Sequence, residues 1–289
     1  MEYLLFFILG ALISVLSGFF GIGGGFILTP FLMLIGYAPI EAITTSLLFT
    51  IGSSVSGIIG HIKYKNIQWK QGLILGVSGI AATQVAHPFV VFLERNHMDE
   101  WAIPFMYVIL LSYFSIQMLR QGSVHSKSEA VPSALTSLIK MIAIGFFAGF
   151  VSTSMGVGGG FIMVPLTVAF LRFMPKKAVG TSLFAVLMIV TAGFFTYSSS
   201  VSINYAVGLV LLAGGLLGSQ FGAKLTNIFL NREITLLLGC LYVSTLVSVI
   251  LKAFHLNVMG LIVVSLFLFF FFITSLMRLR KHRLELREN

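Results

Sequence analysis

The sequence predicts an all-α, polytopic membrane protein with about nine membrane helices, two short glycine-broken half-helices and two inverted repeats. Three observations lead to this fold. Mean hydropathy is +1.02 and only 9% of the 289 residues are charged, whereas a soluble domain usually carries about 25% charged residues. Apolar stretches long enough to cross a hydrocarbon core of about 30 Å recur along the chain. Finally, two parts of the chain resemble each other.

The apolar stretches cover almost the whole chain. Nine are long enough to span a membrane: 3–20, 40–60, 72–93, 101–120, 136–152, 178–198, 205–224, 233–252 and 258–277. Two shorter stretches, 25–36 and 160–171, each follow a glycine cluster, and a helix of this length reaches only about 18 Å. We therefore expect each to form a broken or re-entrant hairpin with the helix before it.

The composition argues against several other classes of protein. No stretch is long or polar enough for a separate soluble domain, so a soluble enzyme and a nucleic-acid-binding protein are both disfavoured. The single Cys240 lies in an apolar stretch and supports neither a disulfide framework nor a cysteine metal site. The first apolar run has no Lys or Arg before it, which indicates a retained membrane helix instead of a cleaved signal peptide.

Basic residues predict the orientation, because Lys and Arg in short loops stay in the cytoplasm. With the N-terminus outside and each glycine-broken hairpin returning to its starting side, only Arg95 and Lys252 of the 18 basic residues lie outside. We expect a multi-pass protein of the cell (inner or plasma) membrane with an external N-terminus and a cytoplasmic C-terminus. The bilayer is then a partner of the basic tail.

The repeat is visible as aligned motifs. Residues 18–30 (GFFGIGGGFILTP) match 153–165 (TSMGVGGGFIMVP) at an offset of 135, and 39–47 (PIEAITTSL) match 175–183 (PKKAVGTSL) at 136. The matching loops carry opposite charge: HIKYKNIQWK has three lysines where SSSVSIN has no charge, and RFMPKK has three basic residues where GYAP has none. This pattern predicts inverted halves, an architecture that recurs in secondary transporters with midplane substrate sites.

The repeat divides the chain into four parts. The first membrane repeat covers 1–120 and a cytoplasmic linker covers 121–135. The second, inverted repeat covers 136–252, and 253–289 form an extra helix with a basic cytoplasmic tail.

The glycine clusters are the first candidates for a binding site. They consist of Gly23, Gly24 and Gly25 in the first half and of Gly158, Gly159 and Gly160 in the second. A nucleotide loop would need a βαβ context or a Gly-Lys-Ser/Thr sequence, and both are missing. The glycines could simply let helices approach closely. Alternatively, they unwind the backbone at membrane depth, so that amides at two helix starts face one anion from opposite sides.

The hydroxyl pairs beside these clusters are the second candidates. Thr45 and Ser46 in the first half match Thr181 and Ser182 in the second. Their hydroxyl groups can donate to a bound oxyanion, or they can bond carbonyl groups within their own helices.

Four other polar residues lie within or beside the apolar stretches. Gln84 and Gln220 match each other, and a buried amide must be satisfied by a neighbouring helix or by substrate. His87 is a candidate for proton coupling or a structural histidine, and Glu41 is a coupling carboxylate or an interfacial residue. The scarcity of carboxylates argues against a cation carrier, and the sequence predicts neither a metal site nor a cofactor.

With the paired GIGGGFILTP and GVGGGFIMVP runs and the paired ITTSL and VGTSL runs, nearly the whole chain resembles the TauE/SafE family of sulfite exporters, also called toluene-sulfonate uptake permeases. The resemblance implies a bacterial or archaeal-type inner-membrane carrier for sulfite, sulfonates and sulfoacetate-like compounds. It implicates the two glycine triplets and the two Thr-Ser pairs. Thr44 departs from the pattern, since Gly180 stands at its place in the second half.

These observations together predict a secondary transporter of small sulfur-containing anions that works by alternating access, with proton coupling as an additional hypothesis. Alternatives are an uncoupled anion channel and a transporter of another small organic anion, such as a carboxylate. The scattered histidines and the single cysteine argue against an integral-membrane enzyme. The expected partners are a small anion and the bilayer, with no nucleic acid, and a homo-oligomer stays open.

Overall fold

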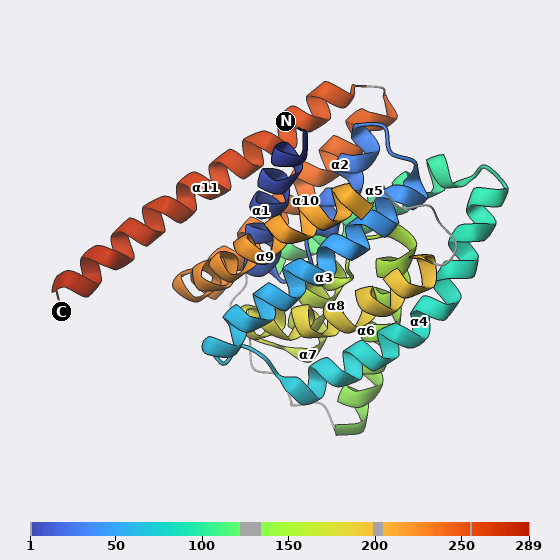
Figure 1. Ribbon diagram of the computed structural model, residues 1–289. Helices are drawn as coiled ribbons and strands as arrows, with labels where there is room; N and C mark the ends of the chain where they lie inside the picture. The colour runs from blue at the N-terminus through green and yellow to red at the C-terminus, as the bar shows by residue number, and fades with distance from the viewer. Residues whose placement is uncertain (1, 122–133, 199–204, 255, 289) are drawn as a thin grey trace.

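The computed structural model describes residues 2–121, 134–198, 205–254 and 256–288, and these residues form eleven helices and no strands (Figure 1). The first half contains α1 (Glu2–Phe20), α2 (Gly25–Leu34), α3 (Pro39–Lys63), α4 (Trp69–Arg95) and α5 (Asp99–Gln121). The second half contains α6 (Ala134–Met155), α7 (Gly160–Leu171), α8 (Pro175–Ser198), α9 (Tyr205–Ile228) and α10 (Asn231–Ala253). The last helix is α11 (Asn257–Glu288). Most of the expected linker 121–135 lies outside the described residues.

Nine of the described helices are long and apolar enough to span a membrane, and α2 and α7 are the two shorter apolar ones. The predicted all-helical, polytopic fold is therefore confirmed. Several helices extend beyond the predicted apolar stretches into the polar residues that flank them. For example, α11 continues through the basic residues to Glu288. The orientation of the halves in a membrane stays a prediction.

The two halves pack into each other. Helix α1 runs along α9, and the equivalent helix α6 of the second half runs along α4. In the same way α3 contacts α9 while α8 contacts α4, and the pairs α3–α8 and α5–α10 also touch. Each half thus contributes its first helix to a contact with the fourth helix of the other half, which places parts of both halves at the centre.

Glycines allow these helices to approach backbone to backbone. A Cβ atom on Gly222 of α9 would lie 2.0 Å from the carbonyl oxygen of Val15 on α1. A Cβ on Gly149 of α6 would lie 2.3 Å from the carbonyl oxygen of Gly79 on α4. Small residues at such crossings are typical of membrane helix packing.

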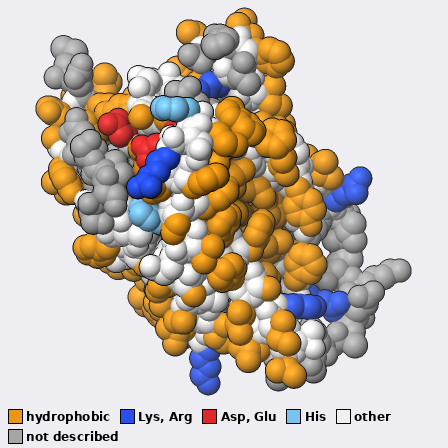
Figure 2. Space-filling view, turned by 90° about the vertical axis from the view of Figure 1, so that its right-hand side faces the viewer, with side chains coloured by type: hydrophobic (Ala, Val, Ile, Leu, Met, Phe, Trp, Pro, Cys, Tyr) orange, Lys and Arg blue, Asp and Glu red, His pale blue; other side chains and the backbone are white. Residues whose placement is uncertain are grey.

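The outer surface is largely apolar. In Figure 2 hydrophobic side chains cover the middle of the face, and Lys and Arg side chains lie toward its edges. Large exposed side chains include Leu73, Val77 and Val85 on α4 and Phe105 and Ile109 on α5. An apolar surface of this extent fits contact with lipid acyl chains.

Helix α11 packs on α10, and its C-terminal part projects beyond the other helices in Figure 1. An ion pair between Arg278 and Glu233 joins the two helices. The Phe271 ring also lies 5.0 Å from that of Phe19 and 5.7 Å from that of Phe20. These contacts join the unduplicated last helix to the end of α1.

Candidate functional site: two facing glycine loops

The chain leaves helical geometry at both glycine clusters. Loop 1 comprises residues 21–24 between α1 and α2, and loop 2 comprises residues 156–159 between α6 and α7. Three glycines of each loop have positive φ angles: Gly21 (72°), Gly23 (84°), Gly24 (75°), Gly156 (67°), Gly158 (82°) and Gly159 (71°). Glycine adopts such angles without the steric cost of a Cβ. Gly25 and Gly160, the last members of the predicted clusters, are the first residues of α2 and α7.

The two loops pack directly against each other. A Cβ on Gly160 would lie 2.1 Å from the carbonyl oxygen of Gly21, and a Cβ on Gly25 would lie 2.3 Å from that of Gly156. These two contacts are reciprocal, because exchanging the halves converts one into the other. Both glycines are buried. The glycine clusters therefore both break the helices and permit close packing.

The loops lie at mid-length of two long helices. Cβ atoms on Gly23 and Gly158 would both meet the side chains of Thr50 and Val186, at 2.9–3.4 Å. Thr50 is eleven residues from the start of α3 and Val186 is eleven residues from the start of α8, in helices of 25 and 24 residues. Since α3 and α8 are candidate spans, this packing places the glycines near the middle of the helical bundle.

Hydroxyl groups of α1 and α3 bond loop 1. The Gly25 amide donates to Thr50 Oγ1 at 3.1 Å, and Ser53 Oγ donates to the Gly23 carbonyl at 3.2 Å. Ser17 Oγ donates to Ser53 Oγ at 3.3 Å. The side chains around loop 1 therefore form a connected set of hydrogen bonds.

The Thr-Ser pairs predicted from the sequence differ in their bonding. Ser182 Oγ donates to the carbonyl of Gly21 at 2.8 Å and to that of Val179 at 2.8 Å. Ser46, its equivalent in the first half, is fully buried, and its hydroxyl has no partner among the described residues. The serine of the second half thus bonds loop 1, whereas the equivalent serine of the first half has an unpaired hydroxyl.

The threonines of these pairs are also buried. Thr181 Oγ1 accepts a hydrogen bond from the Gln68 amide at 3.0 Å, which joins α8 to the connection before α4. Thr45 is 2% exposed and lies in the part of α3 that is buried throughout. The structure therefore uses Thr181 to join the halves.

Loop 2 is bonded by residues of the first half. Thr29 Oγ1 donates to the Gly156 carbonyl at 2.9 Å, and the Tyr107 hydroxyl donates to the Met155 carbonyl at 3.1 Å. The residue equivalent to Thr29 is Val164, which has no hydroxyl. Tyr107 is equivalent to Tyr242, at an offset of 135, and the Tyr242 hydroxyl donates to a carbonyl of α7 at 2.6 Å. Extending the repeat comparison to α5 and α10 would have found these tyrosines.

A second pair of equivalent side chains bonds the ends of α1 and α6. His61 Nε2 lies 2.8 Å from the Gly18 carbonyl oxygen, and the Tyr197 hydroxyl donates to the Thr153 carbonyl at 3.1 Å. His61 and Tyr197 are equivalent by the repeat, as are Gly18 and Thr153. Different ring types thus make the same contact just before each glycine loop.

Gln84 and Gln220 lie away from these loops. Both side chains are exposed on the outside of the helical bundle, and Gln84 Nε2 donates to the neighbouring Thr83 Oγ1 at 3.4 Å. The structure does not bring these residues together with the glycine loops.

His87 and Glu41, the two candidates for proton coupling, are partly exposed. The His87 ring packs edge-on against Tyr197 with centroids 4.8 Å apart, and its buried Nε2 has no partner among the described residues. Glu41 lies in the first turn of α3, where the helix dipole favours a negative charge. Only His87 is linked to a glycine loop, through the contact of Tyr197 with Thr153.

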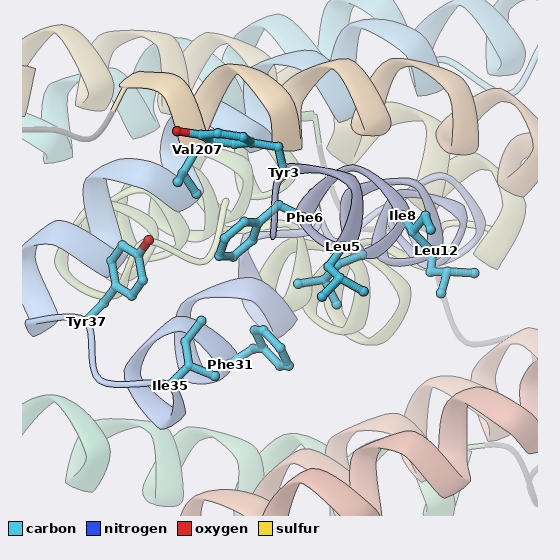
Figure 3. A pocket seen from close by; sticks show the side chains of 10 residues that line it. Tyr3, Leu5, Phe6, Ile8, Leu12, Phe31, Ile35, Tyr37 and Val207 are labelled. Atoms are coloured by element: carbon cyan, nitrogen blue, oxygen red, sulfur yellow. The ribbon is translucent and has the colours of Figure 1, made fainter. Parts of the chain in front are cut away.

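A cavity of about 680 Å³ lies beside α2. Side chains from α1, α2, the α2–α3 connection and α9 surround it, as Figure 3 shows for Phe6, Phe31, Tyr37 and Val207. No lining residue is charged. A smaller cavity of about 80 Å³ lies between α1, α2, α10 and α11 and shares Leu9 and Phe31 with the first. Both cavities therefore lie along α2.

Within the ranges that the structure describes, no three His, Cys, Asp or Glu side chains gather where they could hold a metal ion. The polar groups around the loops are amides, carbonyls, hydroxyls and the buried imidazole of His61.

A model of the sulfite exporter TauE/SafE family matches residues 6–249. The chain belongs to this family. TauE/SafE proteins are membrane transporters, so the chain is a multi-pass membrane transporter. It is similar to "Probable membrane transporter protein YunE" of Bacillus subtilis, with 27% identity over 264 residues, 83% of this chain and 97% of that protein.

Two further relatives of this TauE/SafE chain come from an archaeon and a bacterium. A "Probable membrane transporter protein" of Methanocaldococcus jannaschii is 26% identical over 250 residues, which cover 81% of this chain and 90% of the relative. A "Probable membrane transporter protein" of Haemophilus influenzae is 29% identical over 245 residues, which cover 79% of this chain and 86% of the relative. No solved structure matches the chain significantly.

Proposed function

We propose that the protein is a secondary transporter that moves small sulfur-containing anions, such as sulfite, sulfonates and sulfoacetate-like compounds, by alternating access. The observation that carries this proposal is the pair of glycine loops that face each other at mid-length of α3 and α8. Each loop precedes a short helix, whose first amides and dipole favour an anion. Broken helices at the junction of repeats hold the substrate in many secondary transporters.

The packing of the halves supports the alternating-access part of the proposal. The contacts between the two loops are reciprocal, so each half makes the same contact with the other. Inverted halves that rock about a fixed site are expected to meet in this way. The two adjoining cavities along α2 leave space into which this short helix can move. We place the protein in the cell membrane with the N-terminus outside and the C-terminus in the cytoplasm, as the basic loops predict.

Proton coupling is a separate part of the proposal and rests on His87. Its ring contacts Tyr197, whose hydroxyl bonds the Thr153 carbonyl beside loop 2. Histidine titrates near neutral pH and can therefore relay a proton. In proteoliposomes with an inward proton gradient, the His87→Phe variant should keep passive sulfite flux but lose its stimulation by the gradient.

Flux measurements in proteoliposomes test the main proposal. Purified protein should show saturable uptake of radiolabelled sulfite that methanesulfonate inhibits and acetate does not, because a sulfonate group presents three oxygens to the donors. Inhibition by acetate equal to that by methanesulfonate would favour a carboxylate transporter. Electrical currents far above carrier turnover would favour a channel. Absence of saturable flux, with and without a pH gradient, would contradict the proposal.

A further inference from the structure

We infer that the oxyanion binds asymmetrically, at loop 2 and the start of α7, instead of being shared equally by the two loops. This inference rests on the proposed transport of anions and assigns their binding site to one of the two half-sites. It follows from a difference in how the protein bonds its own polar groups around the loops.

The start of α2 is capped by the protein itself. The Gly25 amide donates to the Gly23 carbonyl at 2.9 Å and to Thr50 Oγ1 at 3.1 Å. On α8, Val186 takes the place of Thr50 and Ile189 takes the place of Ser53. Val186 Cγ1 lies 3.4 Å from the position of a Cβ on Gly158, so an apolar side chain lies beside the loop that precedes α7.

The Gly160 amide is correspondingly unpaired. Among the described residues it has no acceptor, whereas the equivalent Gly25 amide has two. An amide at a helix start that the protein leaves uncapped is available to an anionic oxygen.

An independent observation points to the same place. Ser152 is fully buried, its Oγ has no partner among the described residues, and its Cβ lies 3.1 Å from the position of a Cβ on Gly159. Gly159 is the residue that precedes α7. The equivalent of Ser152 is Ser17, whose hydroxyl bonds Ser53. A buried, unpaired hydroxyl on a residue that packs beside this helix start is a donor that an oxyanion can use.

Further hydroxyl groups near loop 2 are unpaired as well. Thr153 and Ser154 follow Ser152 at the end of α6, and the hydroxyls of both are buried without partners. Ser46 lies one turn along α3 from Ile43, whose Cα is 2.6 Å from the position of a Cβ on Gly156. Around loop 1, Ser17 and Ser182 both bond protein atoms. The unpaired Ser219 hydroxyl lies before this loop, 2.8 Å from the position of a Cβ on Gly18 in the last turn of α1.

These groups suit a sulfite or sulfonate group. Buried polar groups in native proteins are nearly always hydrogen-bonded, so a cluster of unpaired donors marks a place where a ligand completes the bonding. A sulfite or sulfonate group offers three oxygens as acceptors for such donors. Because the cluster is closed off in this structure, the anion reaches it only when the halves move apart during transport.

Binding of radiolabelled sulfite to the purified full chain tests the inference, with Ser152→Ala and its equivalent Ser17→Ala as a matched pair. We expect S152A to raise the Kd for sulfite about tenfold, the effect of losing one hydrogen bond to a charged group. S17A should change the Kd by less than about twofold. Ser46→Ala provides a second, independent variant and should also weaken binding, and melting temperatures verify that each variant is folded.

The outcomes separate this inference from the proposed function. Wild-type binding and flux with equal losses in S17A and S152A, or with no loss in S152A and S46A, would overturn the asymmetric site and leave the transporter proposal intact. A wild type that neither binds nor transports sulfite or methanesulfonate would overturn both.

Discussion

Loop 1 and loop 2 have nearly the same sequence and the same backbone, yet their surroundings differ. Both contain three glycines with positive φ, and each packs on the other. Around loop 1 the hydroxyls of Thr50, Ser53 and Ser182 bond the loop or the helix start that follows it. Around loop 2 the positions of Thr50 and Ser53 are taken by Val186 and Ile189.

This difference shows how a duplicated motif can acquire unequal halves. The backbone geometry depends on the glycines, which both halves contain. The hydrogen bonds depend on side chains of neighbouring helices, which differ between the halves. Substitutions that exchange residues between the halves therefore probe the comparison directly.

The largest effect is expected where the loops touch. Gly160→Ala places a Cβ 2.1 Å from the Gly21 carbonyl oxygen, and Gly25→Ala places one 2.3 Å from the Gly156 carbonyl oxygen. Because backbone must move to relieve either clash, we expect each variant to lose about 3 kcal/mol of stability and nearly all sulfite flux. Melting temperature and flux measure these losses.

Gly36→Ala is the control, since Gly36 has a φ of 101° but no atom within 4 Å of an added Cβ. It should show only the cost of backbone strain, about 1–2 kcal/mol, with flux retained. A loss in G160A no greater than that in G36A would contradict the contact between the loops.

A smaller effect is expected at the carbonyl of loop 2. Thr29→Val keeps the side-chain shape but leaves the buried Gly156 carbonyl without its donor, at a cost of about 1–2 kcal/mol. The reverse exchange, Val164→Thr, should change stability by less than about 0.5 kcal/mol, because Ser182 already bonds the Gly21 carbonyl. Thermal unfolding of both variants in one detergent gives the comparison, and equal shifts would show that the two loops are bonded alike.

A still smaller loss of stability is expected at the start of α2, where Thr50 accepts from the Gly25 amide. Thr50→Val removes one of two acceptors of the Gly25 amide and should cost about 1 kcal/mol. Val186→Thr offers the Gly160 amide an acceptor that it lacks, so it should destabilise less than Thr50→Val. If V186T lowered the melting temperature more than T50V, the difference between the two helix starts would not hold.

The smallest effect is expected far from the loops. Gln84→Ala and Gln220→Ala change exposed side chains on the outside of the bundle, so the double variant should stay within about 0.5 kcal/mol of the wild type. Sulfite flux should also be unchanged. A clear loss of flux would return these glutamines to the substrate path and enlarge the site beyond the loops.

Much of the fold could be predicted from the sequence, because its signals are local. Apolar runs of sufficient length identify the nine candidate spans, and the glycine clusters identify both breaks, since α1 ends at Phe20 and α6 at Met155. The site was harder to predict. Thr50 and Ser152 lie outside the repeated motifs, and Thr29 lies at a motif position where the second half has Val164, so their importance depends on what neighbouring helices place beside them.

By itself, the sequence determined the candidate spans and the positions of the breaks, because hydropathy and glycine content act within a few residues of chain. Only the tertiary structure decided that the loops meet, that Gln84 and Gln220 face outward, and which hydroxyls are bonded. The deciding bonds join residues far apart in the chain, such as Thr29 to Gly156 across 127 positions and Ser182 to Gly21 across 161. No local pattern specifies such a partner, because it depends on how whole helices pack.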